Sequence, residues 1–324
     1  MAQRTLAALG FAALLSSSAS ELVAEPSFWQ RVKSPSLAAE RRLHDALERK
    51  LESFRAVGPE PELKRDLALA AVAMIDLARI DRPRDPALCV LMAEALVLAK
   101  AGREARVREL LQHATATLPE GPLSATAHFR LGLAFARGGE WVRARAAYTR
   151  ALSQGWDAEL RTHAYVYRGY ANLSLGDFSA AIADQRRAVE LAPSKDLEAL
   201  ARYGLGLALE RSGDLPTALG VLEAAARIRL SVPPYDSEDP LELPSVFFVP
   251  TYERHYLRGL SRMAVAKRAG DPDARAAALE AAIAAWDTYL VAAKQDDPYR
   301  GSARNYRERC QDELNAVKGE PTRP

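Results

Sequence analysis

The sequence predicts an all-α fold, a solenoid of antiparallel helix pairs, because one arrangement of small residues repeats along the 324-residue chain. A marker glycine recurs every 37 residues. A small residue lies seven positions before each marker, and two more lie five and twelve positions after it. The interval of seven places the two later residues on one helix face, where another helix can approach closely. The markers are Gly102, Gly139, Gly176 and Gly213.

The small residues predict where the two helices of each pair touch. The first helix would end near the marker, and glycine suits the turn that follows because it adopts positive φ without strain. The second helix would then pack back against the first. The small residues are Ala95, Gly132, Gly169 and Gly206 before the markers, with Val107, Ala144, Ala181 and Ala218, then Ala114, Ala151, Ala188 and Ala225, after them.

Residues 88–230 resemble the tetratricopeptide repeat family, in which Leu-Gly is followed by an aromatic residue, then small-aromatic-small, then proline. The resemblance implies a right-handed superhelical solenoid, and the chain is similar to exported bacterial proteins that contain these repeats. It departs from the pattern at Asn172 and Gln185, where the family usually has a bulky side chain. The best-matching unit contains Leu131, Gly132, Phe135, Ala144, Tyr148 and Ala151.

Outside residues 88–230 the pattern becomes irregular, and apolar stripes and proline content divide the rest of the chain. The predicted segments are a signal peptide at 1–19, a flexible linker at 20–35, a degenerate helix pair at 36–87, a proline-rich insert at 231–250, a divergent repeat at 251–298, a capping helix at 299–318 and a tail at 319–324.

The insert carries five prolines and cannot be helical throughout. It also contains Phe247 and Phe248 in an apolar tetrad that needs something to pack against. The two phenylalanines either fold back near Tyr203 and Tyr256 or dock onto a partner. We expect them to fold back, because neighbouring repeats are the nearest apolar surface.

The first residues have the layout of a secretory signal peptide, with Arg4, an apolar run from Leu6 to Leu15 and small residues thereafter. The alternative is an amphipathic helix that stays on the protein. The apolar run is too short to span a bilayer, and the first cysteine is Cys89, which is too distant for a lipid anchor. We expect cleavage after residue 19, a periplasmic or secreted protein, and no stable membrane insertion.

Charge and cysteine content exclude several classes of function. Loss of Arg4 leaves 43 basic residues, one fewer than the 44 of the whole chain, against 42 acidic ones, so no strong field would recruit nucleic acid. Cys89 and Cys310 are interpreted as small buried residues, because repeats so far apart in a solenoid rarely meet. The five histidines are not at metal-ligand spacing, and no cofactor is expected.

Motifs for catalysis are weak in this sequence, and we expect a protein that is not an enzyme. The run from Gly204 to Gly206 begins like a dinucleotide-binding loop, but it lies inside a helical pattern with no preceding strand. Asp296 and Asp297 precede Pro298 and are interpreted as opening a helix.

The family resemblance implies a ligand groove on the inner face, lined by the first helix of each pair. The corresponding positions are mostly aromatic, which suits an extended or helical peptide. Some family members hold acidic peptide ends with lysines and asparagines here, and this chain lacks them, so an apolar ligand is expected. Alternatively, these side chains only pack between helices. They are Phe129, Leu133, His163, Val166, Tyr170, Tyr203, Leu207, Tyr256 and Leu260.

The sequence therefore predicts a non-catalytic scaffold of the cell envelope that binds a peptide or protein segment of unidentified sequence in a concave aromatic groove. An envelope enzyme or an accessory subunit of one is the first alternative, and it predicts a closed pocket with convergent titratable groups. A structural spacer with no ligand is the second, and it predicts a polar concave strip.

Overall fold

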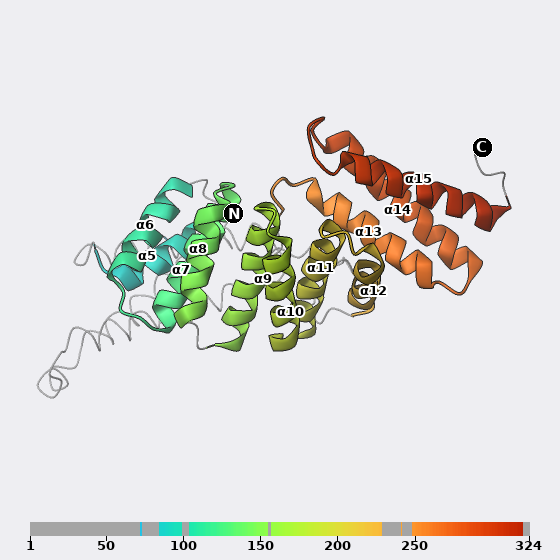
Figure 1. The fold of residues 1–324 in the computed structure, drawn as a ribbon. Coiled ribbons are helices and arrows are strands. Elements are labelled where there is room, and N and C mark those ends of the chain that lie inside the picture. Colours follow the sequence, from blue (N-terminus) through green and yellow to red (C-terminus); the bar gives the residue numbers. More distant parts are fainter. Residues whose placement is uncertain are drawn as a thin grey trace, which may run out of the picture. The chain divides into compact units, whose positions relative to one another are not determined.

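The computed structural model describes residues 84–98, 104–154, 157–228 and 248–319, with single positions at Val72 and Leu241. The regular secondary structure in these ranges consists of α-helices (Figure 1). The chain divides into two compact units, Met1–Arg103 and Glu104–Pro324. The first contains α5 (Pro86–Leu98). The signal peptide, the linker and nearly all of the predicted degenerate pair lie outside the described residues.

The second unit is a succession of helices in which each packs on the next. The largest contacts join α7 to α8, α9 to α10, α11 to α12 and α13 to α14, and α15 packs on α14. This pairing confirms the predicted all-α fold of stacked helix pairs. The helices are α6 (Glu104–Thr117), α7 (Pro122–Arg137), α8 (Trp141–Gln154), α9 (Ala158–Ser174), α10 (Phe178–Leu191), α11 (Lys195–Arg211), α12 (Leu215–Ala226), α13 (Glu253–Arg268), α14 (Pro272–Ala292) and α15 (Arg300–Lys318).

The turn inside each regular pair is built on the marker glycine. Gly139, Gly176 and Gly213 have φ values of 73°, 77° and 94°, a region that side chains disfavour. The second helix begins two residues later in each case. Asp177 and Asp214 cap two of these helices by accepting a hydrogen bond from a backbone N–H in the first turn. Local sequence thus fixes both the reversal of the chain and the helix start.

The glycine seven residues before each marker lies where the second helix comes closest. A Cβ on Gly132 would lie 2.5 Å from the Tyr148 ring, and a Cβ on Gly206 would lie 2.5 Å from Leu222. The partner of Gly169 is Gln185, at 2.6 Å. The absent side chain therefore lets a larger one fill the space between the helices. The alanines that face this contact are almost fully buried, at Ala144, Ala151, Ala181, Ala188, Ala218 and Ala225.

The less regular end of the unit uses the same packing with larger side chains. Gly259 on α13 faces the ring of Trp286 on α14, which is fully buried. Asp271 caps α14 by accepting a hydrogen bond from the Ala274 N–H. On α15 the buried face includes Ala303 and Cys310, and the rest of that helix is strongly polar. The segment predicted as a divergent repeat contains α13 and α14, and the segment predicted as a capping helix contains α15.

Part of the proline-rich insert packs into the core of this end. Leu241 and Phe248 are 3% and 7% exposed and belong to the same apolar cluster as Tyr203 and Tyr256. Phe248 therefore lies against the surface on which the sequence predicted it to fold back. Phe247 lies outside the described residues.

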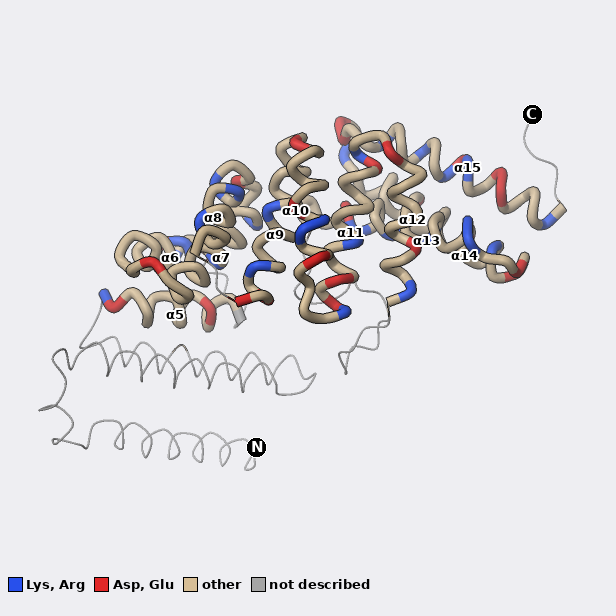
Figure 2. Tube along the Cα trace, turned by 60° about the horizontal axis from the view of Figure 1, so that its bottom comes forward, with Lys and Arg blue, Asp and Glu red and all other residues tan. Residues whose placement is uncertain are grey.

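Charges of both signs are interspersed along the helices of the second unit (Figure 2). Many of them form ion pairs three or four residues apart, such as Arg106 with Glu109 and Arg202 with Glu198. In the part of the chain that is described, no helix is both long and apolar enough to span a bilayer. Cys89 and Cys310 are both buried, as the sequence predicted.

Candidate binding site

A cavity of about 330 Å³ lies within the second unit, where the ends of several helices meet. Trp141 comes from the first turn of α8, Arg211 from the last turn of α11, and Glu253 from the first turn of α13. Asp297 comes from the connection between α14 and α15. The charged groups thus come from helix ends or from the connection beside them, and aromatic side chains form a large part of the wall. The rings of the wall are Trp141, Tyr148, Tyr167, Tyr170, Phe248 and Tyr299.

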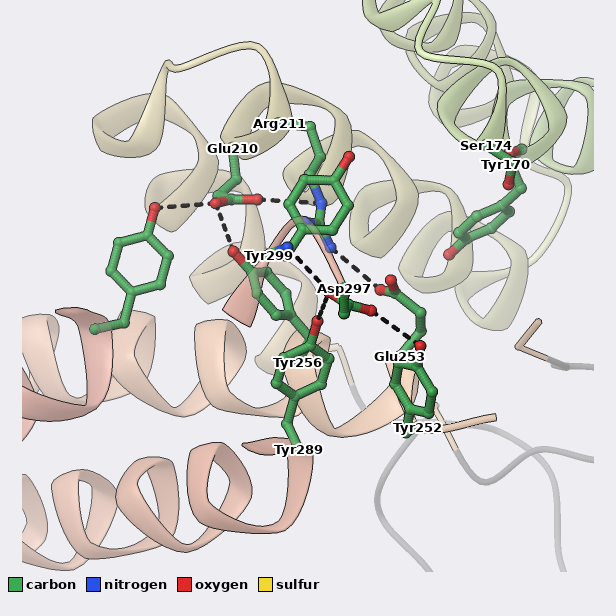
Figure 3. Close-up of polar contacts among 11 residues, drawn as sticks. Tyr170, Ser174, Glu210, Arg211, Tyr252, Glu253, Tyr256, Tyr289, Asp297 and Tyr299 are labelled. Atoms are coloured by element: carbon green, nitrogen blue, oxygen red, sulfur yellow. Dashed lines mark hydrogen bonds and ion pairs between the residues drawn. The ribbon is translucent and has the colours of Figure 1, made fainter. Parts of the chain in front are cut away.

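Arg211 is the central charge of the site, with a side chain only 3% exposed. Its Nη2 donates to Glu253 at 3.2 Å, and its Nε lies 3.5 Å from Glu210 Oε2. The guanidinium also stacks on the rings of Tyr256 and Tyr299 (Figure 3). Two carboxylates and two aromatic faces therefore fix its position.

The Glu210 carboxylate joins three helices. Its Oε1 accepts hydrogen bonds from Tyr256 on α13 at 2.8 Å and from Tyr306 on α15 at 2.9 Å. Glu210 itself lies near the end of α11 and is 7% exposed. A charge that is buried this far needs such partners. The bond between Tyr306 and Glu210 also ties α15 to α11, which lies four helices earlier in the chain.

Asp297 is the second carboxylate that gathers tyrosine hydroxyls. Tyr289 donates to its Oδ1 at 2.5 Å and Tyr252 to its Oδ2 at 3.0 Å. The backbone N–H of Tyr299 also donates to Oδ1 at 2.9 Å. The sequence interpretation of Asp297 as a helix-opening residue was incomplete, because its main partners are hydroxyls from α14 and from the residue preceding α13. Burial and this carboxylate raise the pKa of Tyr252 to about 12.

Within the described part of the chain, three buried polar atoms of the lining residues have no hydrogen-bond partner. They are the hydroxyls of Tyr148 and Tyr170 and the Nη1 of Arg211. Tyr148 is 0% exposed, and Tyr170 points across the space toward Arg211 and Glu253 (Figure 3). Buried polar groups in native proteins are nearly always bonded to protein or water. A ligand donor or acceptor that reached them would therefore satisfy groups that the described residues leave unbonded.

Glu253 has a pKa above its ordinary value. Burial is the largest cause, and Asp297 and Glu210 raise the pKa further, whereas Arg211 lowers it. The raised pKa of Glu253 therefore reflects its removal from water more than the charges around it.

We expect the substitution Glu253→Gln to make stability less dependent on pH. A carboxyl whose pKa is raised on folding contributes stability below its unfolded value, near 4.5, and loses that contribution as pH rises through the folded value. The wild-type protein should therefore lose stability relative to the Gln variant as the pH rises from 4.5. Urea unfolding of both proteins across this range measures the difference. A difference in stability between the wild type and Glu253→Gln that stays constant across this pH range would contradict the assignment.

The structure places the predicted groove residues mainly in the packed interior. Phe129, Leu133, Val166, Tyr203, Leu207, Tyr256 and Leu260 are each at most 8% exposed, and His163 and Tyr170 are partly buried. Only Tyr170 and Leu207 of this set line the cavity.

A second group of rings from the predicted set lies next to the cavity wall. Phe129 contacts His163 and Tyr148, and the ring of His163 stacks on Tyr167 at 6.4 Å. Burial lowers the pKa of His163, so its ring is neutral in most conditions. Tyr148 and Tyr167 therefore connect this cluster to the cavity.

The sequence analysis missed most of the charged side chains of the site. Arg211, Glu253 and Asp297 follow no helical period, because each lies at or beyond a helix end. One signal was present: Arg211 precedes the marker Gly213 by two residues, so it had to lie at the end of a helix.

The second unit is thus a solenoid of helix pairs that contains a cavity lined in large part by aromatic side chains. Residues 92–159 and 195–229 match the tetratricopeptide repeat family. These residues are tetratricopeptide repeats, as the sequence pattern predicted.

Comparison with solved structures finds further proteins of this kind at low identity. YrrB, described as a TPR protein with an unusual peptide-binding site, is 19% identical over 67% of this chain and 96% of its own, with a TM-score of 0.43. The C-terminal part of a TPR repeat-containing protein from Cytophaga hutchinsonii is 12% identical over 86% of this chain and 96% of its own, with a TM-score of 0.45. A comparison with curated proteins finds no match.

Proposed function

We propose that this protein is a non-catalytic scaffold that binds a segment of a partner protein in the aromatic cavity. The observation that carries the proposal is the set of three unpartnered polar atoms on the cavity wall. Tetratricopeptide repeats generally mediate interactions between proteins, which supports a protein ligand over a small metabolite. Tyr170 and Leu207 link this cavity to the groove that the family resemblance implied.

Binding fits the polar groups of the site better than catalysis does. Asp297 accepts hydrogen bonds from two tyrosine hydroxyls, and Glu253 accepts one from Arg211. Neither carboxylate is therefore placed as a general base beside a nucleophilic side chain. Ser174, a hydroxyl on the cavity wall, donates to the carbonyl of Tyr170 instead of to a base. General-base catalysis needs a base within hydrogen-bond reach of the group it activates.

We place the scaffold in the cell envelope, as a periplasmic or secreted protein. The support is the signal-peptide layout of residues 1–19, which lie outside the described residues. The partner would then be another exported protein or the exported part of a membrane protein.

A photo-crosslinking amino acid at position 174 tests this proposal in cells that naturally express the chain. Ser174 is exposed and lies on the cavity wall, so we expect it to capture one defined partner. The matched control is the same amino acid at position 291, where Val291 is 88% exposed on α14 and away from the lining. The mass of the protein that carries the crosslinker should show that residues 1–19 have been removed. Equal capture at both positions, or an intact amino terminus, would contradict the corresponding part of the proposal.

A further inference from the structure

We infer that the cavity recognises a basic side chain, lysine or arginine, presented by the bound segment of the partner protein. This inference rests on the proposed function and adds the chemistry of the ligand. Four features of the cavity support it: its charge, its unpartnered hydroxyls, its rings and its size.

The charges around the cavity favour a cation. Glu253 and Asp297 line it, and Glu210 lies directly behind Arg211. Among the described residues of the lining, Arg211 is the one cation. Two carboxylates against one guanidinium leave the lining itself with an excess of negative charge in a buried region, where charges interact more strongly than in water.

The unpartnered hydroxyls offer acceptors to the same cation. The oxygens of Tyr148 and Tyr170 have no partner, and a phenol oxygen can accept a hydrogen bond from an ammonium or guanidinium N–H. Tyr170 faces Glu253 across the cavity (Figure 3). A donor between them would satisfy a hydroxyl and a carboxylate at once.

The rings and the dimensions fit a long basic side chain. Trp141, Tyr167 and Tyr170 present aromatic surface to the cavity, which attracts cations and packs against methylene groups. A volume of about 330 Å³ is at the small end for ligand pockets, so it suits one side chain and not a whole folded element.

The insert that leads to the cavity wall does not supply such a side chain. Residues 231–247 contain no lysine or arginine, and they carry Asp236, Glu238, Asp239 and Glu242. The segment that leads to the cavity wall at Phe248 is therefore acidic. The competing ligand is a carboxylate bound to Arg211 Nη1, and it would enter a cavity that two carboxylates already line.

Two small probes with the same shape test the inference on the full-length chain. N-acetyl-arginine amide carries the charge, and N-acetyl-citrulline amide is its neutral isostere. We expect the arginine probe to shift the indole N–H resonance of Trp141, assigned with Trp141→Phe, and to bind at least ten-fold more tightly than the citrulline probe. Equal affinity overturns the inference, and tighter binding of N-acetyl-aspartate amide would show a carboxylate site instead.

Variants of cavity residues test whether the preference for the arginine probe over the citrulline probe arises in the cavity. Glu253→Gln should reduce the ten-fold preference to less than three-fold, and Glu280→Gln, which alters an exposed ion pair with Lys318, should keep it. Tyr170→Phe removes one hydroxyl while keeping the ring, and it should weaken the arginine probe more than the citrulline probe. A preference that survives both cavity variants overturns the inference.

The two proposals fail separately. Partner capture at position 174 without a preference for the arginine probe would overturn this inference and leave the proposed function standing. A clear arginine preference without a captured partner would overturn the scaffold function alone. If both hold, the captured segment carries lysine or arginine at the crosslink.

Discussion

Replacing Glu210 with alanine is expected to lower the free energy of unfolding by about 3 to 5 kcal/mol, the usual cost of removing one member of a buried charged network. The change leaves the hydroxyls of Tyr256 and Tyr306 without their acceptor and takes one of two carboxylates from Arg211. Urea unfolding followed by circular dichroism gives the total loss. Hydrogen exchange should show that protection falls most in α13 and α15, because Glu210 joins these helices to α11.

A graded series separates this network from a general effect of substitution. Glu210→Gln retains one acceptor oxygen and should cost less than alanine. Glu280→Ala removes an exposed ion pair with Lys318 and should cost at most about 1 kcal/mol. A Glu210→Ala variant no less stable than Glu280→Ala would show that the tyrosine bonds do not hold this end together.

Adding one methyl group at Gly206 is expected to destabilise the protein by about 1 to 3 kcal/mol, although alanine is the better helix former. The new Cβ would lie 2.5 Å from Leu222, which is fully buried and has no space to move into. Thermal or urea unfolding measures the loss.

Gly220 on α12 provides the opposite case in the same helix pair. It is exposed in the helix interior, and a Cβ there would meet nothing within 4 Å. Gly220→Ala should therefore stabilise the protein by about 0.5 to 1 kcal/mol. Effects of the same sign at the two glycines would mean that the helices of this pair are not packed as the repeat register requires.

The regular part of the fold was predictable because its cause is local and periodic. The offset between Gly206 and Gly213 places a small residue two helical turns before a turn, and this alone predicts a close helix contact. The positive φ at Gly213 and the helix start at Leu215 followed the same pattern.

The candidate site was only partly predictable, because it depends on contacts between residues far apart in the chain. Tyr306 lies 96 residues from Glu210, and neither position is marked by a motif. The resemblance named Tyr170 on α9 and Leu207 on α11, which both line the cavity, but burial had to be read from the structure. Sequence order does not show which buried hydroxyls lack a partner.

The buried amide of Gln185 makes one interface between repeats different from the others. It lies between Gly169 on α9 and Gly204 on α11, and it donates to the Val166 carbonyl. Positions equivalent to Gly204 in neighbouring repeats hold Arg130 and Tyr167, whose side chains are far larger than that of glycine. Repeats with similar surfaces are at risk of docking with the wrong neighbour while the chain folds. A contact that needs glycine on both sides of one amide gives α9, α10 and α11 a means of recognising each other as neighbours.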